Sequence, residues 1–169
     1  MLPRLAYRTR QFWNALSALR KPVETGMLVP YLSPTQIFLF RRMQPSEQTH
    51  AVQVFERLKT AGQTDPDLLA AALLHDVGKV MFPLSLIERI AIVLGNRFFR
   101  RKSGQWSNGP MTWLRRPFVV AAHHPQWGAD LAEQAGASDR TVGLIRSHQD
   151  APTGSDPLLT VLQSADDEY

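Results

Sequence analysis

The sequence contains no cysteine among its 169 residues. This absence excludes a disulfide framework, a thiolate metal site and a cysteine nucleophile, so that any bound metal must be held by imidazole and carboxylate groups. Long hydrophobic runs are also missing, because runs such as 90–94 are far too short to span a membrane. The N-terminus lacks the apolar segment of a secretory signal. These absences predict a cytoplasmic protein without a transmembrane segment.

Acidic residues are absent before Glu24, although the net charge is only +4, from 19 basic and 15 acidic residues. The basic residues gather in two segments, 4–21 and 97–102. Such patches can attract nucleic acid or an anionic membrane surface. A solvated helical face in a mildly basic protein has the same composition, so both interpretations stay open.

Alternating strand patterns are also lacking, and nearly every segment has apolar residues at helical spacing. With 44% hydrophobic residues, the chain can form one core of ordinary size. We therefore predict an all-α fold with a single helical domain over 33–169, preceded by a basic helical extension over 1–32.

Proline and glycine mark the expected helix boundaries. Ser33-Pro34 and Asp65-Pro66 are typical helix starts. A helix from near Ser46 should end at Gly62, the helix that begins at Pro66 should end at Gly78, and a helix is predicted over 86–94. A loop is predicted over 103–110. A short helix from Pro117 should end near His124, because Pro125 disfavours helical geometry in the residue before it. Further helices are predicted over 128–135, over 139–148 and from 156 onward.

Two carboxylates occupy apolar surroundings. His75 and Asp76 follow the run 68–74, which should pack in the middle of the fold, and Asp166 shares the helix face of Leu159 and Leu162. Burying a carboxylate costs on the order of several kcal/mol unless a cation or hydrogen-bond donors compensate it. A shared cation therefore explains both positions.

Three further histidines, His50, His124 and His148, lie beside apolar faces or at predicted helix ends. Together with the carboxylates they suit a divalent transition metal. Each has an alternative explanation, since a single histidine near an apolar face is more often a hydrogen-bonded core residue than a ligand. Asp166 has the alternative of capping a helix or pairing with an arginine.

The segment 71–79, which reads AALLHDVGK, closely resembles the signature of the HD superfamily of metal-dependent phosphohydrolases. In that family the histidine and aspartate of the signature bind metal together with an earlier histidine and a late aspartate, commonly preceded by alanine. His50 and the pair Ala165-Asp166 match these positions. The resemblance covers roughly residues 46–167 and implies a compact HD-like helical bundle.

Family members with a second metal add a histidine in a His-Pro-x-x-Gly context and another beyond it, and His124 and His148 resemble these. His123 is the alternative to His124. The pattern is partly similar to the HD-GYP branch, which cleaves cyclic dinucleotides. This chain, however, reads His148-Gln149-Asp150 where that branch has His-His-Glu, and it lacks the Gly-Tyr-Pro motif. The substrate of that branch is therefore not transferred.

The resemblance implies hydrolysis of a phosphoester, of the nucleotide or cyclic nucleotide class among others, by metal-activated water. One or two ions of manganese, iron, zinc, cobalt or nickel would bind, with Asp76 as the catalytic bridge between the ions. The implied ligands are His50, His75, Asp76, His124, His148 and Asp166. Lys79 would add a positive charge near the phosphate of a small molecule or nucleotide. Its alternative is an exposed lysine at a helix C-terminus.

Three other functions compete with this one. A catalytically silent HD-like module would bind metal or a nucleotide for regulation. A serine hydrolase would use Ser147, His148 and Asp150, but the Gly-x-Ser-x-Gly elbow is absent. A basic peripheral protein would dock through its two basic segments. The oligomeric state is left open by the sequence.

Overall fold

The computed structural model describes residues 23–98, 106, 110–113, 115–151 and 154–167, and the regular elements in these ranges are all helical. The all-α prediction is therefore confirmed. In chain order the elements are the 3-10 helix η1 (Thr25–Leu28), α2 (Pro34–Arg41), α3 (Pro45–Thr60), α4 (Pro66–Leu74), the 3-10 helix η2 (Val77–Met81), α5 (Leu86–Phe98), α7 (Arg116–Gln134), α8 (Asp139–Ser147) and α9 (Pro157–Asp167).

Helices begin where the local chemistry predicts. The Ser33 hydroxyl accepts a hydrogen bond from the backbone N–H of Gln36, whose side chain accepts one from the Ser33 N–H in return. The Asp65 carboxylate accepts a hydrogen bond from the N–H of Leu68 at 2.9 Å. Each cap satisfies donors that the first turn of a helix leaves without partners. These contacts set the starts of α2 and α4.

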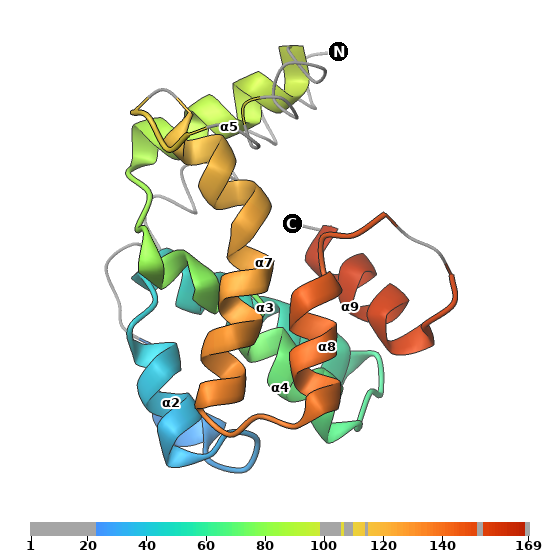
Figure 1. Ribbon diagram of the computed structural model, residues 1–169. Helices are drawn as coiled ribbons and strands as arrows, with labels where there is room; N and C mark the ends of the chain where they lie inside the picture. The colour runs from blue at the N-terminus through green and yellow to red at the C-terminus, as the bar shows by residue number, and fades with distance from the viewer. Residues whose placement is uncertain (1–22, 99–105, 107–109, 114, 152–153, 168–169) are drawn as a thin grey trace, which may run out of the picture.

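The centre of the fold is α4, in which every residue from Leu68 to Leu74 is buried. This helix packs against α3, α8 and α9, and Figure 1 shows α4 lying among them. Because His75 and Asp76 follow α4 directly, the chain places an imidazole and a carboxylate next to the core. Their exposed fractions are only 1% and 3%.

The longest described helix, α7, contains Pro125 in its interior. The prediction of two helices, one ending near His124 and one over 128–135, is therefore wrong. An interior proline costs about 3 kcal/mol, but side chains on both sides of it, such as Val120 and Ala132, are buried. α7 packs along its length against η2, α8 and α5 (Figure 1). Burial along the whole helix outweighs the local cost, since each buried apolar side chain contributes about 1.5–3 kcal/mol.

The helix predicted to run to Gly78 ends earlier, at Leu74, and a turn at His75 and Asp76 leads into η2. Gly78 therefore does not terminate α4, and it is not among the described glycines with positive φ. It allows η2 to approach α7 closely, because a Cβ atom at Gly78 would lie 2.0 Å from the carbonyl oxygen of His124. Glycine is needed here for space, not for backbone conformation.

The basic segment 4–21 lies outside the described residues, as do positions 99–102 of the second basic segment and most of the predicted loop 103–110. The described part of the predicted extension, 23–32, contributes Leu28 and Leu32 to the same core as the helical domain. Among the described residues, no single helix is long and apolar enough to cross a membrane. The segments Pro66–Met81 and Leu86–Ile92 pass that test only as a pair, which is bent by 110°.

Candidate metal centre

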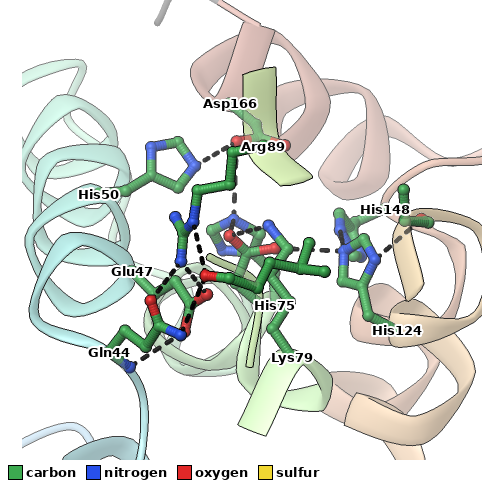
Figure 2. Close-up of polar contacts among 12 residues, drawn as sticks. Gln44, Glu47, His50, His75, Lys79, Arg89, His124, His148 and Asp166 are labelled. Carbon is green, nitrogen blue, oxygen red and sulfur yellow. Dashed lines mark hydrogen bonds and ion pairs between the residues drawn. The ribbon is translucent and has the colours of Figure 1, made fainter. Parts of the chain in front are cut away.

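All six predicted ligands come together beside the end of α4, in two neighbouring groups. They are His50 in α3, His75 and Asp76 directly after α4, His124 in α7, His148 directly after α8 and Asp166 in α9. Figure 2 shows the labelled side chains converging from these separate elements. The fold thus joins residues that are up to 116 positions apart in the sequence.

The first group consists of His50, His75 and Asp166. Asp166 Oδ1 lies 2.7 Å from His50 Nε2 and 3.6 Å from His75 Nε2. His75 Nε2 is buried and has no hydrogen-bond partner within reach, since its other carboxylate neighbour, Asp76 Oδ2, is 3.7 Å away. A buried ring nitrogen that faces two carboxylates without hydrogen-bonding to either fits a site for a cation.

The second group consists of Asp76, His124 and His148, all of them buried. His124 Nε2 lies 3.2 Å from Asp76 Oδ1 and 3.3 Å from His148 Nε2. Two histidine nitrogens that bind one tetrahedral zinc ion, each about 2.0–2.1 Å from the metal, lie roughly 3.3–3.4 Å from each other. The spacing of these two nitrogens therefore fits a common metal ion.

Backbone carbonyls set the tautomers of the three buried histidines. The Nδ1 atoms of His75, His124 and His148 lie 2.9, 2.9 and 2.7 Å from the carbonyl oxygens of Ala72, Ala121 and Ile145. Because a carbonyl can only accept, each Nδ1 must carry the hydrogen. In the neutral ring Nε2 then carries no hydrogen, and its lone pair is available to a metal ion. All three Nε2 atoms face the carboxylates or each other.

Asp76 belongs to the second group and lies beside the first, with Oδ1 towards His124 and Oδ2 towards His75. Burial alone would raise the pKa of this carboxyl. Lys79, whose Nζ donates a hydrogen bond to Oδ2 at 2.6 Å, acts with His75 to hold the pKa well below its usual range instead. Asp76 is therefore ionised at neutral pH, as a ligand must be.

The histidines differ in how their surroundings affect protonation. Burial lowers the pKa of His148 to about 3, with help from His75 and His124, and burial also lowers the pKa of His124. Burial opposes protonation of His75 as well, but Asp76 and Asp166 outweigh it and raise the pKa of that ring. His124 and His148 are thus neutral at pH 7 and available as ligands.

The comparison with known families agrees with this geometry. A family model described as the HD domain matches residues 48–168. The chain belongs to the HD domain family. Proteins with this domain are mostly metal-dependent hydrolases, and HD domains bind divalent metals. No significant match was found among curated proteins or solved structures.

The remaining sequence candidates lie beside the two groups of candidate ligands or outside them. His123 is exposed, and its ring stacks on Trp127 with the ring centroids 5.8 Å apart, so it belongs to neither group. Gln149 is exposed as well. The ring nitrogens of His148 face Ile145 and His124, not Ser147 or Asp150. This geometry does not support a serine-hydrolase triad.

Sequence reasoning missed an ion pair with a buried carboxylate, one turn before His50. Glu47, which is 2% exposed, lies 2.7 Å from Nη2 of Arg89. That nitrogen also lies 2.7 Å from the side-chain oxygen of Gln44 (Figure 2). Burial raises the pKa of Glu47, whereas Arg89 and Lys79 oppose this. No local pattern indicated this pair, because its two residues are 42 positions apart in the sequence.

Proposed function

We propose that this HD domain is a metal-dependent phosphohydrolase that cleaves a phosphoester with water, and that its six clustered histidines and aspartates are the metal ligands. The observation that carries the proposal is the position of Asp76, whose two oxygens face different histidine groups. Two-metal hydrolytic sites hold their ions about 3.5–4 Å apart. A single carboxylate can bridge such a distance through its two oxygens.

A bound divalent ion supplies Lewis-acid chemistry, because it lowers the pKa of water from 15.7 to about 7 and stabilises charge on phosphoryl oxygens. His50, His75 and Asp166 would hold one ion, and His124 and His148 a second, with Asp76 shared. Imidazole and carboxylate donors suit manganese, iron, cobalt, nickel and zinc. The unprotonated Nε2 atoms of His124 and His148 and the ionised Asp76 are already in the state that binding requires.

The substrate would approach from the side of the first group. The side chains of His50, Asp166 and Lys79 are 17%, 22% and 21% exposed, whereas the second group is almost completely buried. Lys79 keeps Asp76 ionised and carries a positive charge that a phosphate can reach. A phosphorylated small molecule or a nucleotide fits this arrangement of an open edge with a cation beside it.

The test is the metal content per chain, measured by elemental analysis of protein purified without chelator or affinity tag. We expect about one or two transition ions in the wild type and almost none in Asp76→Ala. Asp167→Ala is the matched control, because Asp167 is exposed beside Asp166 and lies outside both groups. Circular dichroism of each variant verifies that it is folded.

Metal in the wild type justifies a screen of phosphomonoesters, nucleotides and cyclic nucleotides for turnover. Stoichiometric metal without turnover of any phosphoester would overturn the enzymatic proposal and support a regulatory metal-binding module instead. A wild-type protein that takes up no metal, even after reconstitution with manganese, iron and zinc, would overturn the metal site itself.

A further inference from the structure

The three buried histidines of the site share one local geometry. In each, Nδ1 donates to the carbonyl oxygen of the residue three positions earlier, at 2.7–2.9 Å. In an uninterrupted α-helix that carbonyl accepts the backbone N–H of the residue four positions further on, which is the residue directly after the histidine. The shared geometry therefore depends on a missing backbone hydrogen bond after each histidine.

For two of the histidines the end of a helix explains the missing bond. His75 and His148 directly follow the last residues of α4 and α8. The last four carbonyls of a helix have no partner within it, and those of Ala72 and Ile145 are among them. Each ring takes the place of the absent N–H.

His124 is different, because it lies in the interior of α7, where carbonyls normally have helical partners. The partner of the Ala121 carbonyl would be the N–H of residue 125. That residue is Pro125, which has no N–H. The Ala121 carbonyl is thus left for His124 Nδ1, which lies 2.9 Å away.

We propose that Pro125 is a positioning residue, which acts by removing one backbone donor in mid-helix and so assigns the Nδ1 hydrogen of His124 to the Ala121 carbonyl. Nε2 of His124 is then left unprotonated, facing Asp76 Oδ1 at 3.2 Å and His148 Nε2 at 3.3 Å. Inside α7, Pro125 leaves a carbonyl without a backbone N–H partner, as the helix ends do for His75 and His148. The effect on the tautomer stands by itself, whereas the consequence for metal binding rests on the proposed function.

Alanine at position 125 would restore the competing donor. Its N–H would bind the Ala121 carbonyl, and the nearest other acceptor for His124 Nδ1 is the Val120 carbonyl at 3.2 Å. In a regular helix that carbonyl already accepts the N–H of His124 itself. The ring would therefore share its best acceptor with a backbone donor, which weakens the hydrogen bond that fixes its tautomer and orientation.

The test compares Pro125→Ala with the wild type by three measurements. Nitrogen-15 NMR of the imidazoles in metal-free protein at neutral pH should show that the Nδ1–H form of His124 is less populated in the variant. Affinity for zinc or manganese, measured by calorimetry, should fall about tenfold, because partners that orient a ligating histidine contribute 10–100-fold. The melting temperature should rise, since an interior proline destabilises a helix.

The matched control is Pro117→Ala in the first turn of the same helix, where no backbone donor is needed. It should leave the His124 tautomer and the metal affinity unchanged.

An altered tautomer in Pro125→Ala supports the inference even if the wild type binds no metal. That absence of metal would overturn the proposed function alone. An unchanged His124 tautomer in Pro125→Ala would overturn the inference, even if the variant is more stable. An altered tautomer with unchanged metal affinity would overturn its link to metal binding.

Discussion

Substitution of Gly78 by alanine tests how tightly the centre of the site is packed. The added Cβ atom would lie 2.0 Å from the carbonyl oxygen of His124 and 2.6 Å from the backbone nitrogen of Gly128. Both are backbone atoms of α7, so neither can rotate away as the end of a flexible side chain would. η2 and α7 would have to separate by more than about 1 Å to reach ordinary contact distances.

The cost of that separation follows from known effects of overpacking. Inserting a group into a well-packed core costs about 1–3 kcal/mol, and the clash with these two backbone atoms of α7 places Gly78→Ala near the upper end of this range. Asp76 precedes Gly78 by two residues, and the nearest clashing atom belongs to His124. The 3.2 Å approach of Asp76 to His124 should therefore widen, which weakens metal binding as well as folding.

Urea denaturation of the metal-free protein measures the change in folding stability, and calorimetric titration with metal measures the change in affinity. The control is Gly143→Ala in α8, because a Cβ atom there would meet nothing within 4 Å. That variant should be more stable by about 0.5–1 kcal/mol, as expected for an alanine that replaces a mid-helix glycine. Equal stability and metal affinity in Gly78→Ala and wild type would refute the reasoning.

Two further substitutions address the charges around the site. The pKa of His148 is about 3 in the fold and about 6.5 in the unfolded chain. Acidification from pH 7 to 5 therefore protonates this ring in the unfolded chain alone, which lowers the free energy of unfolding by about 2 kcal/mol. His148→Gln should therefore flatten the pH dependence of metal-free unfolding by about that amount, and parallel curves for the two proteins would contradict the assignment. Arg89→Ala leaves the buried carboxylate of Glu47 without its cation and should cost about 1.5–3 kcal/mol in urea denaturation. Arg140→Ala removes an exposed ion pair with Asp156 and should cost less than about 1 kcal/mol, so similar losses in these two variants would argue against a special role for Glu47.

The centre of the molecule follows from a short stretch of sequence. The apolar run 68–74 could be stable only if buried, so the His75-Asp76 pair that follows it had to lie beside the core. The caps at Ser33 and Asp65 are equally local, since each depends on residues within one turn. Local chemistry of this kind can be read from sequence because it involves no distant partner.

The path of α7 could not be read in the same way. Pro125 locally favours a helix end, and only the burial of side chains on both sides of it keeps the helix continuous. The close approach of Gly78 to α7 is likewise a contact between elements distant in the sequence. In both cases tertiary packing outweighs a local preference of a few kcal/mol.

Short sequence segments were sufficient to identify the HD family, the all-helical fold and the candidate ligands, because helical periodicity and a carboxylate that follows an apolar run are local patterns. The packing of the helices was needed to divide those ligands into two groups, with Asp76 of the second group beside His75 of the first, and to pair Glu47 with Arg89. These features depend on distances of 2.7–3.6 Å between side chains of separate elements. A one-dimensional pattern does not specify such distances, which the packing of the helices sets.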